Sequence, residues 1–277
     1  MKINKKKLFI TAIILLIIII LDCWGFSMKT EYYTVESDKI DTPIRIVFIS
    51  DLHNCFYGGF DQSGIIDAIE EAQPDIVLFG GDIVSKTGGT ENAETLLRAV
   101  SEKYPCAYSA GNHEEMRSDK SAVFKMIDGA GVTVLNGQST DLEIKGQKIH
   151  ISGIVEPFTY SDQLQQIFGA IAPESYDILL LHQPECVTEC ISPPFTKKAD
   201  FDLILSGHDH GGQWRIPYIL EQGLYAPDQG FFPEYTNGQR QFGSTVHIVS
   251  RGLARQLNMI FIPRIFNRPE FSVIDIT

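Results

Sequence analysis

The sequence predicts a layered α/β fold, and three features of the chain support this prediction. Several segments are apolar almost throughout, as strands covered on both faces are; examples are IRIVFIS at residues 44–50 and DIVLFG at residues 75–80. Segments with apolar residues at helical spacing separate such strands, an alternation typical of layered α/β folds. The chain has 277 residues, 44% of them hydrophobic, which is enough for one large domain with a packed core.

Residues 1–26 are predicted to form a signal anchor. A basic start (MKINKKK) precedes an apolar run of 14 residues from Leu8 to Leu21. This run is shorter than the roughly 20 residues of a membrane span, but no small-residue cleavage site follows it, which favours an uncleaved anchor over a cleaved signal peptide. Because lysines precede the run, we expect a single-pass protein of the cytoplasmic membrane with its body on the extracytoplasmic side. Secretion after signal cleavage is the alternative.

The predicted elements of the body follow one another from residue 27 onward. Residues 27–43 are predicted as a linker with an edge strand at Tyr32–Val35, and residues 44–277 as the folded domain. Apolar stripes around residues 65–69, at 92–102, around 123–127 and at 161–170 predict helices. Further strands are expected at residues 106–112, 142–144, 149–152, 177–182, 202–208, 246–250 and 271–276. Residues 213–245, rich in glycine, proline and aromatic residues, are predicted to be irregular.

The charge of the chain is unevenly distributed. The formal net charge is −12, and residues 1–26 carry four lysines against one aspartate, so the rest of the chain carries −15. An acidic body disfavours a nucleic-acid groove, whose affinity depends on lysine and arginine. It is compatible with an enzyme that attracts an anionic substrate through bound cations.

Polar residues follow the ends of five predicted strands. They are Asp51 and His53, then Asp82, then Asn112 and His113, then His182, and finally His208 and His210. Ligand sites of open α/β sheets form at the carboxyl ends of strands, so we expect these side chains to meet in one crevice. The other two histidines, His150 and His247, alternate with apolar residues inside strands and are predicted to be structural.

The number of candidate ligands predicts two metal ions. The seven candidates are Asp51, His53, Asp82, Asn112, His182, His208 and His210. One ion of about four to six ligands cannot use them all, whereas two ions sharing a bridging carboxylate can. Nitrogen and oxygen ligands without a thiolate favour Mn, Fe or Zn. His208 and His210 can reach different ions, although their spacing alone also permits one, and the glycines around them are expected to let a substrate phosphate approach.

The motifs DLH, GD, GNHE, a histidine after a buried strand, and GHDH occur in the order of the calcineurin-like metallophosphoesterase signature. Over about residues 44–277 the chain therefore resembles that superfamily. SGHDHGGQWRIP and VSRGL further resemble its membrane-anchored bacterial phosphodiesterase branch. The resemblance implies a four-layer α/β/β/α sandwich of two mixed sheets, with a dinuclear metal site at the carboxyl ends of the strands.

The resemblance also implies roles for the site residues. Asp51, His53 and His210 would hold the first metal, Asn112, His182 and His208 the second, and Asp82 would bridge them. A metal-bridging hydroxide would attack phosphorus, and His113 would protonate the leaving oxygen or stabilise the transition state. Asp209 is expected only to tune the ligands beside it.

The expected substrate is a phosphodiester or pyrophosphate, with a lipid-linked or cell-envelope precursor as one candidate and no nucleic acid. A phosphomonoesterase of the same family and a non-catalytic metal-binding scaffold are the alternatives. Arg251 is predicted either to contact substrate phosphate or to form a structural ion pair. The sequence leaves the oligomeric state open.

Overall fold

The computed structural model describes residues 27–155, 174–191, 201–255 and 264–277, with isolated positions among residues 6–16 and at Gln163 and Ile167. Within these residues, no helix has the length and apolar character needed to cross a membrane. The predicted signal anchor at residues 1–26 and the predicted helix at Ser161–Ala170 fall outside the continuously described ranges.

One sheet has six strands, and its outermost member is the predicted edge strand. Its strands, in spatial order, are β1 (Lys29–Val35), β14 (Glu270–Ile276), β2 (Ile44–Ile49), β3 (Ile76–Phe79), β4 (Cys106–Tyr108) and β5 (Thr133–Val134). All neighbouring pairs are parallel except β14 with β2. The sequence did not predict β5, because two residues are too few to show a periodic pattern.

A second six-stranded sheet carries the rest of the strands that build the sandwich. In spatial order they are β12 (Gly238–Phe242), β13 (Thr245–Val249), β9 (Leu203–Ser206), β8 (Tyr176–Leu181), β7 (Gln147–Ile154) and β6 (Ser139–Ile144). The two outer pairs are antiparallel and the inner pairs are parallel, so both sheets are mixed.

The prediction of irregular structure for residues 213–245 was partly wrong. This segment contains β12 and a small hairpin of β10 (Tyr225–Ala226) and β11 (Gly230–Phe231). The sequence of β12, GQRQF, shows almost no apolar alternation, because this strand is at the sheet edge and gets its order from pairing with β13.

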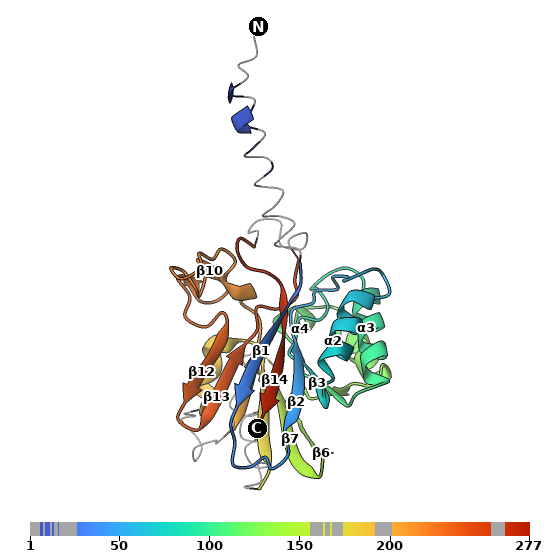
Figure 1. Ribbon diagram of the computed structural model, residues 1–277. Helices are drawn as coiled ribbons and strands as arrows, with labels where there is room; N and C mark the ends of the chain where they lie inside the picture. The colour runs from blue at the N-terminus through green and yellow to red at the C-terminus, as the bar shows by residue number, and fades with distance from the viewer. Residues whose placement is uncertain are drawn as a thin grey trace.

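Alternate residues of the central strands enter different cores, which explains why these strands are apolar throughout. Ile46 and Phe48 of β2 pack between the two sheets with residues of β8 and β9. Val47 and Ile49 pack on the outer face, which the helices α2 (Ser63–Ala72), α3 (Glu91–Ser101) and α5 (Lys120–Gly129) cover (Figure 1). A third cluster joins the outer face of β8 and β9 to α7 (Val187–Ile191). These layers confirm the predicted α/β/β/α sandwich.

The carboxyl ends of β2, β3, β8 and β9 meet at one end of the sandwich. The backbone N–H of His208 after β9 donates to the Asp51 carboxylate after β2, and the ring of His182 after β8 contacts the Gly80 carbonyl after β3. The short helices α4 (Asn112–Glu115), η2 (Pro184–Cys186) and η3 (His210–Gly212) begin beside this junction. The hairpin of β10 and β11 and the loops around it, which we call the β10 region, lie at the same end of the molecule as the amino end of β1 in Figure 1.

Candidate metal centre

The structure brings all seven predicted ligands together at this end. Ligand atoms of Asp51, His53 and His210 form one group within 4.8 Å of one another, and those of Asp82, His182 and His208 form another. The rings of His53 and His210 are 5.3 Å apart and those of His182 and His208 are 5.1 Å apart. Asn112 joins the second group through its Oδ1, 3.1 Å from Nδ1 of His208.

Asp82 lies between the two groups. Its Oδ2 is 3.5 Å from Nε2 of His53 and 3.4 Å from Nε2 of His182. Its Oδ1 accepts a hydrogen bond from the backbone N–H of His113 (2.8 Å), which fixes the direction of the carboxylate. One buried carboxylate oxygen therefore faces ring nitrogens of both groups, as a bridging ligand must.

The hydrogen bonds of two histidines test whether cations fit. Nδ1 of His182 lies 2.7 Å from the Gly80 carbonyl, which can only accept, so Nδ1 carries a proton and Nε2 faces Asp82. Nε2 of His182 is buried without a hydrogen-bond partner. Nε2 of His208 similarly donates to Asp228 (2.9 Å), so the lone pair of Nδ1 faces the Asn112 oxygen. Electron pairs facing one another across about 3 Å fit an intervening cation.

Sequence reasoning did not find Asp228. This exposed residue stands in the turn between β10 and β11, and its carboxylate orients the His208 ring. Gln183 also donates to Asp228 (3.3 Å). Because Asp228 belongs to a segment without periodic pattern, its contact with His208 depends on how the β10 region folds back over the site.

The protonation of the cluster also suits cations. Burial lowers the pKa of His53 to about 3 and that of His208 to about 4, so both rings are neutral near pH 7. Burial opposes ionisation of Asp82, but the neighbouring His182 and His53 hold its pKa well below its usual range. Burial alone would lower the pKa of His182, yet the Asp82 charge raises it to about 10. A proton between Asp82 and His182 is what a bound cation would replace.

Glu114, the last letter of the GNHE motif, has a supporting role that the sequence did not assign. Its buried carboxylate accepts three backbone N–H groups, from Asp82 (2.8 Å), Gly111 (3.0 Å) and Val84 (3.0 Å). Burial raises its pKa to about 7. Glu114 therefore ties the turn that carries Asp82 to the turn that carries Asn112.

The backbone at the site is strained. Five of the seven candidate ligands have positive φ: Asp51 (52°), His53 (50°), Asp82 (53°), His208 (71°) and His210 (48°). A side chain in this left-handed region costs of order 1 kcal/mol, and such strain concentrates at functional sites. The surrounding packing therefore holds these side chains in directions that the local chain would not choose.

The glycine of the SGH motif has a packing role that the sequence did not predict. A Cβ at Gly207 would lie 2.4 Å from Oδ2 of Asp51 and 2.6 Å from Oγ of Ser50. Gly207 lets two strand ends approach closely enough for Asp51 to reach the His208 backbone. That the glycines here admit a substrate phosphate stays a prediction.

His113 stands at the solvent border of the cluster. The backbone N–H of Lys86 donates to its Nδ1 (3.1 Å), so the neutral ring carries its proton on Nε2. That nitrogen lies 3.9 Å from Oδ2 of Asp82, and about a third of the side chain (35%) is exposed. His113 can therefore present an N–H to a group bound at the metal centre.

Two other residues singled out from the sequence, Asp209 and Arg251, have structural contacts. Asp209 is buried, and its Oδ2 accepts a hydrogen bond from Gln229 (2.5 Å), which ties the metal-binding turn to the β10 region. Nε of Arg251 lies 3.3 Å from the buried Glu270 carboxylate. This contact favours the ion-pair alternative, and contact of Arg251 with substrate stays a prediction.

The two strand histidines have the predicted structural character. His150 is buried beside Asp141 (2.6 Å), and His247 is buried beside the Ser206 hydroxyl (2.9 Å).

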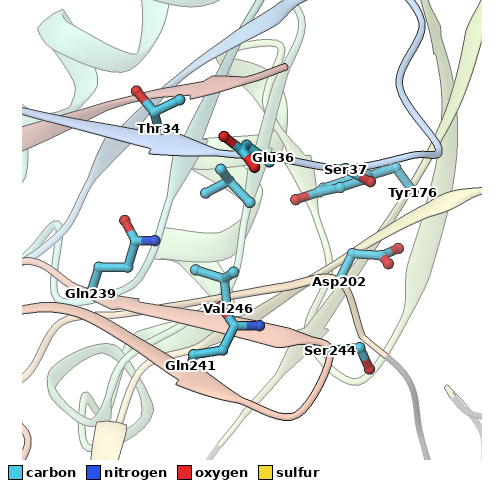
Figure 2. A pocket seen from close by; sticks show the side chains of 10 residues that line it. Thr34, Glu36, Ser37, Tyr176, Asp202, Gln239, Gln241, Ser244 and Val246 are labelled. Carbon is cyan, nitrogen blue, oxygen red and sulfur yellow. The ribbon is translucent and has the colours of Figure 1, made fainter.

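A pocket of about 410 Å³ lies at the opposite end of the sandwich. Figure 2 shows its side chains, which come from the end of β1, the starts of β8 and β9, and the β12–β13 hairpin. They are mostly polar: Thr34, Val35, Glu36, Ser37, Tyr176, Asp202, Gln239, Gln241, Ser244 and Val246. None of the predicted site residues lines this pocket, so it is separate from the metal centre.

Known proteins resemble this chain over most of its length. The sequence profile of the family described as "Calcineurin-like phosphoesterase" matches residues 44–212, more than half of the chain. The chain is 28% identical to the uncharacterized metallophosphoesterase YkuE of Bacillus subtilis over 255 residues, 89% of this chain and 84% of that protein. It is 27% identical to the phosphodiesterase YaeI of Escherichia coli over 242 residues, 84% of this chain and 82% of that protein.

Among solved structures, the NAD nucleotidase (NadN) of Haemophilus influenzae resembles this chain with a TM-score of 0.53 and 16% sequence identity. The match covers 76% of this chain but only 45% of the nucleotidase. At this level of identity, the likeness concerns the fold alone.

Proposed function

Because the chain belongs to the calcineurin-like phosphoesterase family, we propose that it is a membrane-anchored enzyme that hydrolyses a phosphodiester or pyrophosphate bond. The observation that carries this proposal is the position of Asp82, whose Oδ2 faces His53 of one ligand group and His182 of the other. A buried carboxylate that faces ring nitrogens of two histidine groups is suited to binding two divalent cations.

The proposed first metal site consists of Asp51, His53 and His210, and the second of Asn112, His182 and His208, with Asp82 common to both. Nitrogen and oxygen donors without a thiolate favour Mn, Fe or Zn. When bound, two such cations neutralise the charge of the phosphoryl oxygens and lower the pKa of water.

The protein's own groups complete the reaction. Glu114 holds the backbone of Asp82, and the backbone N–H of His113 orients the Asp82 carboxylate. The Gly80 carbonyl holds the His182 ring in place. Because the backbone N–H of Lys86 occupies Nδ1, the N–H at Nε2 of His113 can donate a hydrogen bond that stabilises the charge developing on the leaving oxygen. The leaving oxygen takes its proton from solvent, to which the His113 side chain is partly exposed.

One consideration supports a diester over a monoester. YaeI of Escherichia coli, similar over most of its length, is named a phosphodiesterase. A non-catalytic scaffold would lack ligands or His113, whereas this chain has the whole set.

The location is proposed from the sequence. The basic residues before the apolar run favour a single pass through the cytoplasmic membrane with the catalytic domain outside. Secretion after signal cleavage is the alternative. The mass of the mature chain recovered from the membrane fraction tests this, because loss of residues 1–26 would refute an uncleaved anchor.

Hydrolysis of bis-(p-nitrophenyl) phosphate by the full chain in detergent with Mn²⁺ tests the activity. We expect turnover by the wild type and its loss in His113→Ala, with unchanged metal content. His150→Ala removes a histidine outside the site and is the matched control, in which turnover should persist. Wild-type turnover in His113→Ala would refute the role of His113, and no turnover by a wild type that binds metal would favour the scaffold.

A substrate panel separates the enzyme alternatives. Glycerophosphodiesters, nucleotide-sugar pyrophosphates, phospholipids and monoesters are compared by kcat/KM with the full chain. We expect the highest value for a diester or pyrophosphate, and a preference for monoesters would replace the proposed function by its runner-up.

A further inference from the structure

Exposed apolar side chains gather in the segment that follows His210. Tyr218 is 94% exposed, Ile219 81%, Phe231 70% and Phe232 72%. Trp214, Ile216 and the nearby Phe266 are exposed by 41–49%. We call these seven residues the apolar loop surface: Trp214, Ile216, Tyr218, Ile219, Phe231, Phe232 and Phe266. So many large apolar residues exposed in connected loops indicate a contact surface, because monomeric soluble proteins rarely expose them together.

This surface is connected to the metal centre on two sides. Asn267, next to Phe266, donates from its Nδ2 to the backbone carbonyls of His210 (2.6 Å) and Gln213 (3.1 Å). Asp228 contacts the ring of His208 and lies three residues before Phe231 in the same hairpin. The loops that expose the apolar side chains therefore also hold two of the candidate metal ligands.

The surface is also connected to the start of the described chain. Trp214 pairs with Ile265 in a parallel bridge, and three residues later Arg268 donates to the carbonyls of Ser27 (3.0 Å) and Met28 (2.8 Å). Ser27 directly follows the basic and apolar residues 1–26. The β10 region and the amino end of β1 accordingly lie at one end of the molecule in Figure 1.

We propose that the apolar loop surface rests in the interface of a lipid bilayer, so that the metal centre acts on lipid-linked phosphoesters presented at the membrane surface. This inference depends on the membrane anchoring proposed above, and it gives that anchor a defined orientation. Tryptophan and tyrosine favour the headgroup level of a bilayer, whereas phenylalanine and isoleucine favour the acyl boundary.

The chemistry of the surface favours a bilayer held by apolar contact. Between residues 214 and 233 the charged residues are Arg215, which is buried, and Glu221 and Asp228. Anionic lipids would repel a body of charge −15. We therefore expect contact with the bilayer not to require anionic lipid, unlike that of a basic membrane-binding patch.

Trp214 reports directly on this contact, because the chain has two tryptophans and the other is Trp24. The full chain with Trp24→Phe is placed in phosphatidylcholine vesicles whose acyl chains are brominated or unmodified. We expect brominated lipid to quench Trp214 emission at least twofold, with and without phosphatidylglycerol. A control reporter is Ser244→Trp in the Trp24→Phe/Trp214→Phe chain, at the opposite end of β13, whose emission should not change.

Equal Trp214 emission in brominated and unmodified vesicles would overturn the proposal. So would a blue shift of Trp214 that grows with protein density without bromine quenching, because a second copy of the chain would then cover the surface. The measurement needs no catalysis, so its outcome is independent of whether the proposed hydrolysis is found.

A kinetic comparison tests the consequence for substrate access. The double variant Phe231→Ser/Phe232→Ser should retain kcat/KM for soluble bis-(p-nitrophenyl) phosphate. Its rate on the p-nitrophenyl phosphodiester of diacylglycerol in vesicles should fall at least tenfold, since the leaving group is the same and only presentation differs. An equal fall on both substrates, or on neither, would refute a role of the surface in access. No hydrolysis of either substrate by the wild type would instead refute the proposed function.

Discussion

The two ends of β8 and β9 offer a direct comparison within one molecule. At the carboxyl ends stand His182 and His208 of the metal centre, and at the amino ends stand Tyr176 and Asp202 of the polar pocket (Figure 2). Both ends carry buried polar groups on the same two strands. They differ in how the charges of those groups are compensated.

At the pocket end, the protein compensates its own carboxylates. Nζ of Lys39 lies 2.7 Å from Asp202 and 3.5 Å from Asp177, and the Ser175 hydroxyl donates to Asp177 (2.9 Å). At the other end, Asp82 faces histidines whose rings burial keeps neutral, with the exception of His182. The protein's own groups therefore balance the carboxylate charges at the pocket end, whereas bound cations would balance the charge at the metal end.

The backbone conformations at the two ends of the sandwich also differ. Residues 175–177 and 202–203 at the pocket end have no positive φ, whereas five candidate ligands at the metal end do. Backbone strain and unmatched lone pairs therefore occur together at the proposed metal centre. The packing of the rest of the sandwich stabilises this strained arrangement.

Removal of the shared Asp82 carboxylate should have the largest effect at the metal end. We expect Asp82→Ala to lose both bound cations. Its kcat/KM should fall by more than the roughly 10–100-fold that is typical when a residue hydrogen-bonded to a metal ligand is replaced. Metal content after gel filtration and hydrolysis of bis-(p-nitrophenyl) phosphate measure this. Asp177→Asn at the other end of β8 is the control and should keep both properties; a loss there as large as in Asp82→Ala would contradict the division between the two ends.

A methyl group at Gly207 should disturb the metal end without removing a ligand. In Gly207→Ala the new Cβ would lie 2.4 Å from Oδ2 of Asp51, so we expect lower affinity for Mn²⁺ and a loss of about 1–3 kcal/mol of unfolding free energy. Gly129→Ala, where no atom lies within 4 Å, should cost nothing. Metal titration and urea unfolding measure both, and unchanged Mn²⁺ affinity in Gly207→Ala would be incompatible with this packing.

His247 should make the unfolding free energy depend on pH independently of the metal centre. Burial lowers its pKa to about 3. The unfolded chain therefore takes up the proton preferentially as pH falls below about 6.5, and stability that is present above this value is lost. Between about pH 7 and pH 5, wild type should lose about 2 kcal/mol more than His247→Gln. Urea unfolding should give the same difference with and without Mn²⁺; a difference that depends on Mn²⁺ would couple His247 to the metal site.

The smallest effect is expected at the pocket end. Lys39→Met removes a partly exposed ion pair with Asp202, so we expect a loss of about 1 kcal/mol in unfolding free energy and no change in turnover. Urea unfolding and the same hydrolysis assay measure this. A fall in turnover would show that the two ends are coupled through β8 and β9, contrary to the comparison.

Local patterns predicted a layered α/β fold and the meeting of the site residues, whereas the four-layer sandwich was implied by the resemblance to the metallophosphoesterase superfamily. Runs such as IRIVFIS indicate strands buried on both faces, and polar residues placed just after them lie at one sheet edge. Asp228 and Glu114 escaped prediction for different reasons. Asp228 reaches His208 through a long irregular segment, and Glu114 is buried by contacts with the turn of another strand. Neither contact follows from spacing along the chain.

The sequence by itself determined where the buried strands lie along the chain and which seven residues are candidate ligands. It also determined the acidic body and its basic, apolar start. Only the tertiary structure decided that Asp82 stands between the two histidine groups and that Gly207 makes room for Asp51. It alone also placed the apolar loop surface beside the start of the described chain. The physical reason is that periodicity records which face of an element is buried, whereas distances between strand ends arise from packing between sheets.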